Sequence, residues 1–156
     1  CMKITKNFSM SEYTRSYTAR RNNIDNQPPE ALLPIITNLF ENVVQLVRDE
    51  FGPTRINSGY RSEQLNKVVG GSARSQHCLG EAVDLEVRGI SNKLVADWII
   101  TNCKFDQLIL EFHTEGDDDS GWIHVSCKGN LDSNRSESLV SYHDSLGRVK
   151  YDVYTG

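Results

Sequence analysis

Three short segments of this sequence alternate apolar residues with residues that can ionise. The segments are Ala82–Val87, Gln107–Phe112 and Trp122–Ser126. Side chains of a β-strand point to opposite faces in turn, so each segment predicts a strand with one apolar face and one face that carries an ionisable group. If the apolar faces cover a common core, Asp84, Glu111 and His124 converge on the other face of the sheet. Carboxylates and an imidazole gathered there could form a site, although a solvated sheet face shows the same pattern.

Two segments before these strands have helical character. Ser9-Met-Ser-Glu12 matches a capping box, which predicts a short helix from about Met10 to Arg20. Pro28-Pro29-Glu30 opens the longest predicted helix, since proline is tolerated where the first backbone N–H groups have no partner. Its apolar residues recur at helical spacing until Gly52-Pro53 ends it. We expect this helix to be a core element.

The predicted elements after Pro53 are shorter. They are a strand at Thr54–Ser58, a helix at Ser62–Val69, a helix at Ser91–Asn102, and a final hairpin around Tyr142 and Val149–Val153. The apolar stripe of the helix at Ser91–Asn102 consists of Leu94, Val95, Trp98 and Ile99. A polar loop, 114–121, joins two of the strands that carry ionisable groups as a long hairpin. No repeat or linker divides the chain, so we expect one α+β domain over residues 1–156, with an antiparallel sheet flanked by helices.

Composition narrows the classes of protein to which the chain could belong. Its 156 residues carry a net charge of −4 and its 17 basic residues are scattered, whereas a nucleic-acid partner requires a basic patch. No apolar run approaches the ~20 residues that span a bilayer, and the start lacks the apolar segment of a signal peptide.

The cysteines of the chain do not suggest a disulfide framework. Besides Cys1 there are three, Cys78, Cys103 and Cys127, which is an odd number, and none of them form a C-x-x-C spacing. Cys1 precedes Met2 and is expected to be an addition to the natural chain.

One motif is more specific than any periodicity. Residues 75–84 read Ser-Gln-His-Cys-Leu-Gly-Glu-Ala-Val-Asp, the pattern S-x-H-x-x-G-x-A-x-D, and Trp122-Ile-His-Val-Ser126 follows. Together with Ser58-Gly-Tyr-Arg-Ser62, these segments resemble the zinc D-alanyl-D-alanine carboxypeptidase and L-alanyl-D-glutamate endopeptidase family, peptidoglycan peptidases that share a fold with the Hedgehog signalling domain. The resemblance runs from about Phe8 to Ser126 and implies a Hedgehog/DD-peptidase-like fold.

The resemblance also implies a zinc site. In that family the histidine and aspartate of the motif and the histidine of the later strand bind zinc, and the matching residues here are His77, Asp84 and His124. Imidazole and carboxylate groups suit zinc, and three such ligands leave a tetrahedral ion with one open position for water. Gly80 lets the chain turn between His77 and the strand of Asp84, and Ala82 leaves the metal side uncrowded. Any one of these histidines taken alone would more often be structural.

The general base departs from the family pattern. Many relatives place an acidic residue three positions before the last histidine ligand, and this position holds Gly121. Glu111 is the expected replacement, because it lies on the adjacent predicted strand and on the same predicted face as His124. His113 is the alternative base, and an ordinary solvated carboxylate is the alternative interpretation of Glu111.

Several other residues near the motif are expected to have supporting roles. Family members use an arginine in this region to hold the peptide carboxylate or the developing oxyanion, which makes Arg61 the expected substrate anchor; a surface arginine that caps the next helix is the alternative. Ser75 and Gln107 are expected to give hydrogen bonds around the site. Cys78 and Cys127 are interpreted as buried thiols. Asp117, Asp118 and Asp119 are interpreted as a solvated loop tip; a calcium site is the alternative, although the run lacks the alternating spacing of a calcium loop.

The expected function is zinc-dependent hydrolysis of a peptide bond in bacterial peptidoglycan stem peptides, by a monomeric D-Ala-D-Ala carboxypeptidase or endopeptidase. The small size, with no secretion signal and no separate wall-binding domain, suggests an endolysin-like enzyme of phage type or a small bacterial enzyme, made in the cytoplasm and acting on the cell wall. Two other classes stay open. A non-catalytic zinc module that binds peptidoglycan or a protein partner is favoured by the glycine at position 121. A structural virion component predicts no bound metal.

Overall fold

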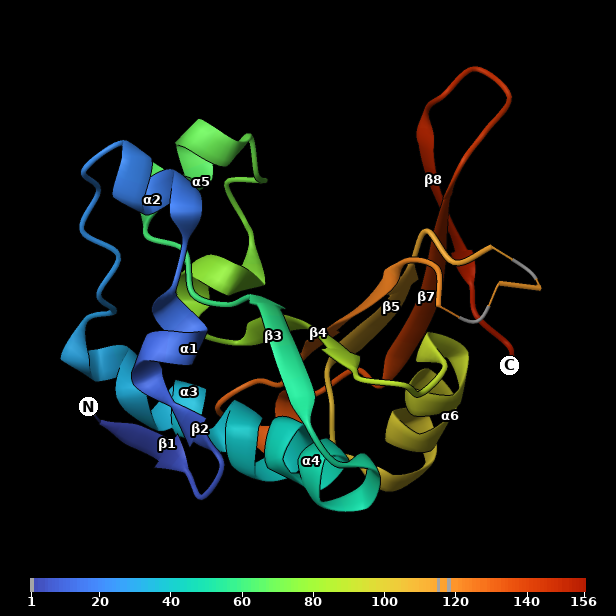
Figure 1. Cartoon of the computed structure of the whole chain (residues 1–156), viewed down its shortest axis with the longest axis horizontal. Coiled ribbons are helices and arrows are strands. Elements are labelled where there is room, and N and C mark those ends of the chain that lie inside the picture. Colours follow the sequence, from blue (N-terminus) through green and yellow to red (C-terminus); the bar gives the residue numbers. More distant parts are fainter. Residues whose placement is uncertain (1, 115, 118) are drawn as a thin grey trace.

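The computed structural model describes residues 2–114, 116–117 and 119–156, and a mixed β-sheet forms its centre (Figure 1). The strand order in this sheet is β3-β4-β6-β5-β7-β8. The strands are β3 (Thr54–Ser58), β4 (Ala82–Val87), β5 (Gln107–Glu111), β6 (Trp122–Ser126), β7 (Glu137–His143) and β8 (Val149–Val153). Two short strands near the N-terminus, β1 (Lys3–Thr5) and β2 (Phe8–Ser9), pair separately. The α+β fold class and the strands predicted around the ionisable residues are confirmed.

The predicted antiparallel sheet contains one parallel pair of strands. β5 and β7 run parallel, with Glu111 opposite Ser141, while the other neighbours in the sheet are antiparallel. The reason lies in the path of the chain. β6 is antiparallel to β5, so β6 ends beside the first residues of β5. From there the chain crosses to the other side of β5, and β7 then runs in the same direction as β5.

The helices follow the local signals of the sequence with one interruption. They are α1 (Met10–Thr14), α2 (Tyr17–Arg21), α3 (Leu33–Leu39), α4 (Gln45–Phe51), α5 (Glu63–Val69) and α6 (Asn92–Asn102). The capping box at Ser9 is present, because the Ser9 hydroxyl accepts from the N–H of Glu12 and the Glu12 carboxylate accepts from the N–H of Ser9. The single helix predicted from Met10 to Arg20 is broken, since Ser16 starts a new helix by accepting the N–H of Ala19.

The long predicted helix runs without a break from Glu30 to Phe51. It comprises a 3₁₀ turn at Glu30–Leu32, α3, a π-helical turn at Phe40–Val44, and α4. Six of its apolar side chains are completely buried: Ile36, Leu39, Phe40, Val43, Val44 and Val47. This helix is long and apolar enough to cross a membrane, but the core helix of a soluble protein can have the same length and composition. In this fold it packs against the sheet.

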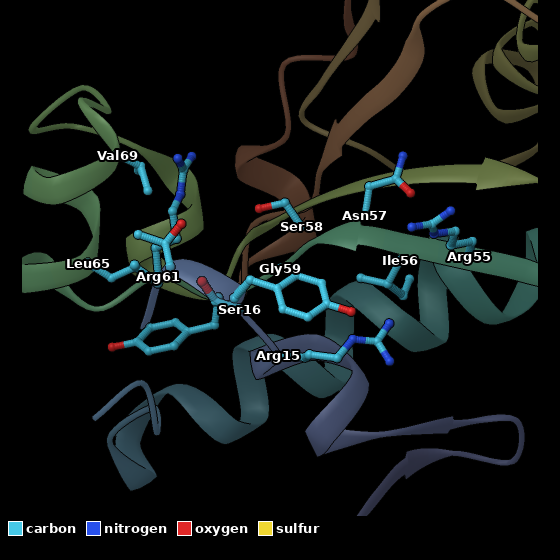
Figure 2. Close-up of a pocket in the computed structure, with 13 residues that line it drawn as sticks. Arg15, Ser16, Arg55, Ile56, Asn57, Ser58, Gly59, Arg61, Leu65 and Val69 are labelled. Atoms are coloured by element: carbon cyan, nitrogen blue, oxygen red, sulfur yellow. The ribbon is translucent and has the colours of Figure 1, made fainter. Parts of the chain in front are cut away.

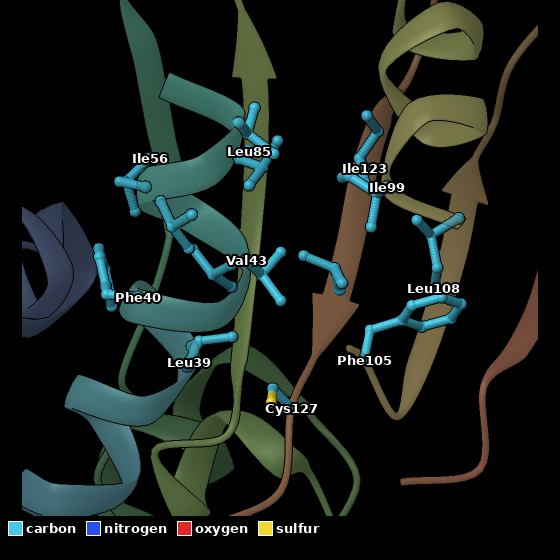
Figure 3. Packing of buried hydrophobic residues seen from close by; sticks show 14 of the residues in the cluster. Leu39, Phe40, Val43, Ile56, Leu85, Ile99, Phe105, Leu108, Ile123 and Cys127 are labelled. Carbon is cyan, nitrogen blue, oxygen red and sulfur yellow. The ribbon is translucent and has the colours of Figure 1, made fainter. Parts of the chain in front are cut away.

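The core lies between one face of the sheet and two helical segments, the long helix and α6 (Figure 3). The predicted apolar faces of the strands point into it, with Val83, Leu85, Leu108, Leu110, Ile123 and Val125 at most 1% exposed. From α6 the buried contacts are Val95, Ala96 and Ile99. Leu94 does not belong to the buried face of α6. It comes one residue before Val95, so its side chain points in another direction around the helix axis, and it is 52% exposed.

The prediction that Phe112 continues the apolar face of β5 is also wrong. The strand ends at Glu111, because Phe112 takes a left-handed backbone conformation with φ of 51°. Its ring then stacks on His143 of β7, with ring centroids 4.5 Å apart, and is tilted against Trp122. The final hairpin of β7 and β8 is thereby held against the end of β5, and the hairpin predicted around Tyr142 and Val149–Val153 is confirmed.

A buried carboxylate joins this hairpin to the rest of the fold. Asp106 lies directly before β5 and is completely buried. The guanidinium of Arg135 donates to both of its oxygens, at 2.8 Å from Nη2 and 3.0 Å from Nε, and Gln76 Nε2 donates to Oδ2 at 2.9 Å. Burial by itself would raise the pKa of Asp106, but these hydrogen bonds outweigh burial and lower the pKa to about 2. The ionised carboxylate therefore ties three segments of the chain together.

We expect removal of this charge to destabilise the fold at neutral pH and to reduce its sensitivity to acid. The folded-state pKa of about 2 lies below the roughly 3.9 of an unfolded aspartate. The stabilisation is therefore present above pH ~4 and is lost as the pH falls toward ~2. Asp106→Asn should lower the free energy of unfolding by about 2–3 kcal/mol at pH 7, as measured by urea denaturation. The matched control is Asp132→Asn, at an exposed carboxylate; equal stability of the two variants would contradict the assignment.

Candidate metal centre

Three side chains meet on the face of the sheet opposite the core. One potential ligand atom from each of His77, Asp84 and His124 lies within 4.8 Å of the other two. Nδ1 of His124 is 3.0 Å from Oδ1 of Asp84, and Nε2 of His77 is 3.5 Å from the same oxygen. Ligands at the usual 2.0–2.2 Å from a tetrahedral zinc ion are about 3.3–3.5 Å apart. Both nitrogen–oxygen distances are thus already close to the spacing that such an ion requires.

The pairing of β4 with β6 brings two of these side chains together. Asp84 and His124 are directly opposite each other in the antiparallel register, so that both point away from the core. His77 comes from a separate element, the 3₁₀ turn Gln76–Leu79, which Ser75 begins by accepting the N–H of His77. Gly80 ends this turn at φ of 71° and leads into β4; a side chain there would also press on Ile36. The expected role of Gly80 in this turn is confirmed.

The hydrogen bonds around His77 leave one ring nitrogen for a metal ion. Its Nδ1 lies 2.8 Å from the carbonyl oxygen of Gly59, which can only accept a hydrogen bond. Nδ1 must therefore carry the proton, and the lone pair of Nε2 faces Asp84. A ligand histidine whose second nitrogen donates to a backbone carbonyl is the usual arrangement at protein metal sites. The residues present therefore fit a divalent metal ion such as zinc.

Asp84 is held in the charged form that a metal ligand needs. Burial by itself would raise its pKa, but the neighbouring His124 and His77 outweigh burial and hold the pKa of Asp84 well below its usual range. Two imidazoles and one carboxylate form a donor set that zinc accepts.

The predicted general base, Glu111, lines the same cleft, which has a volume of about 450 Å³ and also includes His77, Asp84 and His124. Glu111 lies directly opposite Trp122, the residue two positions before His124 on β6, so both side chains share the metal face. Burial raises the pKa of the Glu111 carboxyl above its ordinary value, and a hydrogen bond from Ser141 offsets only part of this rise. A half-buried carboxylate with a raised pKa suits proton transfer near neutral pH.

The backbone explains why position 121 carries no acid. Gly121 has a φ of 70°, and a Cβ atom built there would collide with the carbonyl oxygen of Glu111. No L-residue with a side chain fits this position without moving β5 or β6. An acid at position 121 is therefore excluded by the same strand pairing that puts Glu111 into the cleft.

The alternative base, His113, lies outside the cleft. It follows the end of β5 in the loop, where its Nδ1 is 3.4 Å from Oγ of Ser120. Among the residues that the structure describes, the lining of the metal cleft includes Glu111 and does not include His113. The geometry therefore favours Glu111.

Arg61 lies between the metal cleft and a neighbouring pocket. It lines both of them, and Figure 2 shows it at one end of the second pocket, which has a volume of about 300 Å³. Its Nη2 is 3.4 Å from Oγ of Ser75, and its Nε is buried without a hydrogen-bond partner in the described part of the chain. The backbone N–H of Arg61 donates to the carbonyl of His77, which fixes the arginine beside the metal ligands. A guanidinium with unused donors can bind a carboxylate.

The two predicted supporting residues differ in what they contact. Ser75 touches the site on two sides, since its hydroxyl accepts from the N–H of His77 and from Arg61. Gln107 also lines the cleft, but its amide donates to Glu137 of β7 at 2.6 Å, and no described contact joins it to a ligand. Gln107 therefore supports the strand pairing at the edge of the cleft.

A comparison with protein families agrees with this site. The family model described as Peptidase M15 matches residues 6–126, which include every element of the metal cleft up to β6. The chain belongs to the peptidase M15 family. No curated protein gives a significant match. The protein is therefore a peptidase, and its His77, Asp84 and His124 group provides a place for the metal ion of a metallopeptidase.

Two other expectations about the M15 peptidase concern residues around the site. Cys127 is buried in the core as expected, whereas Cys78, which lies in the 3₁₀ turn and lines a pocket on the surface, is only half-buried. Of the acidic run, Asp118 lies outside the described residues, and Asp117 and Asp119 are exposed. In the described part of the chain, the group formed by His77, Asp84 and His124 is the one that could hold a metal ion.

Two residues that β7 and β8 bring to the cleft of the M15 peptidase are not among those predicted from the sequence. Ser141 of β7 contacts Glu111, and Tyr151 of β8 lines the cleft. Both lie beyond residue 126, where the family match ends. The hairpin around Tyr142 is predicted from the sequence, but a parallel pairing has no turn that would signal its partner strand.

We expect the M15 peptidase to bind one equivalent of zinc through these three side chains. His77→Ala should lose most of the metal, because two remaining ligands cannot hold zinc tightly. Affinity should also weaken as the pH falls, since the ligands must be deprotonated. Equilibrium dialysis followed by elemental analysis measures both effects. Cys78→Ser and Cys127→Ser serve as controls, and loss of zinc in either of them with retention in His77→Ala would contradict the ligand assignment.

Proposed function

We propose that this peptidase uses zinc to hydrolyse a peptide bond in bacterial peptidoglycan stem peptides, as a carboxypeptidase or an endopeptidase. The observation that carries the proposal is the position of the Glu111 carboxylate in the same cleft as His77, Asp84 and His124. A base beside a metal site is what distinguishes a hydrolase from a module that only binds its ligand.

The residues of the cleft have separable roles in this reaction. When bound by His77, Asp84 and His124, zinc supplies the Lewis acidity that hydrolysis of an amide needs. Glu111 accepts a proton from the attacking water and returns it to the nitrogen of the leaving amine, so that it ends the cycle ionised as it began. Its raised pKa supports this exchange, because a carboxyl group that binds a proton more readily is a better base.

The charge distribution of the cleft supports a substrate that carries carboxylates. Arg61 and Arg74 line it on the side of α5 and the 3₁₀ turn, and neither has an ion pair in the described part of the chain. Arg135 also lines it, but its guanidinium is held by Asp106. Stem peptides of peptidoglycan carry free carboxylates beside their peptide bonds, and Arg61 has the unused donors to hold one. We place the action of the enzyme at the cell wall, as an endolysin-like protein of phage or bacterial type.

Glu111→Gln should abolish most hydrolysis and keep the metal. The amide preserves the shape of the side chain but cannot take up a proton, and general base catalysis contributes roughly 10²–10⁴-fold. The measurement is mass spectrometry of muropeptides after incubation with purified protein, together with metal analysis. Glu86→Gln is the matched control, because Glu86 shares the sheet face but contacts Asn57 and does not line the cleft.

Two results of this experiment would change the assignment. Normal cleavage by Glu111→Gln together with inactive His113→Ala would make His113 the base. A zinc-loaded wild-type protein that cleaves no muropeptide would leave the binding module as the function. The masses of the products also identify the bond, whether D-Ala-D-Ala or L-Ala-D-Glu.

Arg61→Lys should impair cleavage while the zinc content and the fold survive. A lysine keeps the positive charge but cannot form the two parallel hydrogen bonds of a guanidinium to a carboxylate. We expect a rise in KM of about tenfold or more, since the loss of one charge-assisted hydrogen bond corresponds to about 1.5–3 kcal/mol. Arg55→Lys, at an exposed arginine of the neighbouring pocket, is the control. Unaltered kinetics of Arg61→Lys would leave Arg61 as a surface residue.

A further inference from the structure

Ser141 of β7 is the side chain in closest contact with Glu111. It is completely buried, and in the parallel pairing of β5 with β7 it lies directly opposite Glu111, so both side chains point to the metal face. Its Oγ is 2.5 Å from Oε2 of Glu111, and this is the one side-chain hydrogen bond that Glu111 makes in the described part of the chain. Ser141 belongs to the C-terminal segment that the M15 family match does not cover.

The other hydrogen bonds of Ser141 determine the direction of this contact. The backbone N–H of Phe112 points at Ser141, 3.1 Å from its carbonyl oxygen and 3.3 Å from its Oγ. Because an N–H can only donate, it occupies an acceptor position of the hydroxyl group and leaves the hydroxyl proton for Glu111. Ser141 therefore donates to the carboxylate, which stabilises its ionised form and holds one of its two oxygens in place.

We propose that Ser141 is a positioning residue for the base: it fixes Oε2 of Glu111 so that the free oxygen, Oε1, faces the metal cleft. The inference rests on the proposed hydrolytic function. A carboxylate on a strand end could otherwise rotate about its side-chain bonds, and a base must be held within hydrogen-bond reach of the proton that it takes.

The fold holds Ser141 rigidly enough for this role. Before β7, Arg135 is bound to the buried Asp106, and the backbone N–H of Glu137 donates to the carbonyl of Asp106 at 2.9 Å. At the other end of the pairing, the ring of His143 stacks on Phe112. Both ends of the β5–β7 pair are thus clamped, with Ser141 between them. The hairpin of β7 and β8, which pairs with β5 (Figure 1), therefore acts on the proposed base through the contact of Ser141 with Glu111.

Kinetics on a muropeptide that the wild-type enzyme cleaves provide the first test. Ser141→Ala should lower kcat about tenfold with little change in KM, a loss equivalent to about 1.4 kcal/mol, because the base is misplaced while the substrate contacts remain. Ser141→Thr, which keeps a hydroxyl group, should recover most of kcat. Ser138→Ala is the control, since Ser138 lies on the same strand but pairs with Leu108 of the core face.

A double-mutant cycle separates positioning from a structural effect. If Ser141 acts through Glu111, then Ser141→Ala should have no further effect on kcat in the Glu111→Gln background. Equal losses in both backgrounds would overturn the proposal, as would unchanged kcat in Ser141→Ala.

Titration of Glu111 by NMR tests the contact without zinc or substrate. The groups that face Glu111 are His124 from β6, Asp84 from β4, His77 from the 3₁₀ turn and Tyr151 from β8, and all remain in both proteins. In metal-free protein labelled at the glutamate carboxyl carbons, Ser141→Ala should raise the pKa of Glu111, because the ionised form loses a donor. An unchanged pKa would overturn the proposal, whereas a raised pKa in a protein that cleaves no muropeptide would support the contact and reject the hydrolytic function.

Discussion

The pairing of β4 with β6 is the constraint on which the site depends. These strands lie inside the sheet, and their register puts Asp84 opposite His124 while Val83 and Leu85 face the core. A slip of one residue would turn the carboxylate toward the buried valines and leucines and expose the apolar side chains to water. The burial of the core face therefore enforces the geometry of the metal face. The hydrophobic effect is not directional, but successive side chains of a strand point to opposite faces, so burial of one face also fixes which side chains lie on the other face.

A second constraint connects elements that the sheet alone would leave independent. The buried Asp106 carboxylate binds Gln76, next to the ligand His77, and Arg135, which precedes β7. An uncompensated buried charge is strongly unfavourable, so both partners must be in place for the fold to be stable. The position of the 3₁₀ turn that carries His77 and the position of β7 that carries Ser141 are thus coupled through one ionised group.

The location of the acid in the cleft shows how backbone geometry limits the choice of residues. At position 121 the left-handed conformation and the close approach of the Glu111 carbonyl leave room for glycine alone. The neighbouring strand offers a position on the same face, and Glu111 occupies it at the last residue of β5. Phe112 then leaves the strand and stacks on His143, which brings β7 alongside β5 and Ser141 into contact with Glu111.

Local patterns in the sequence determined the strands that carry Asp84, Glu111 and His124, the capping box at Ser9 and the faces turned toward the core, because each depends on side-chain alternation or on groups a few residues apart. The motif from Ser75 to Asp84 identified the family, and with it the candidate ligands. Only the tertiary structure decided the parallel β5–β7 pair, the contact of Ser141 with Glu111 and the ion pair of Asp106 with Arg135. These last contacts join residues 29 or 30 positions apart. No local period or turn relates such positions, so their pairing follows from how the whole chain packs.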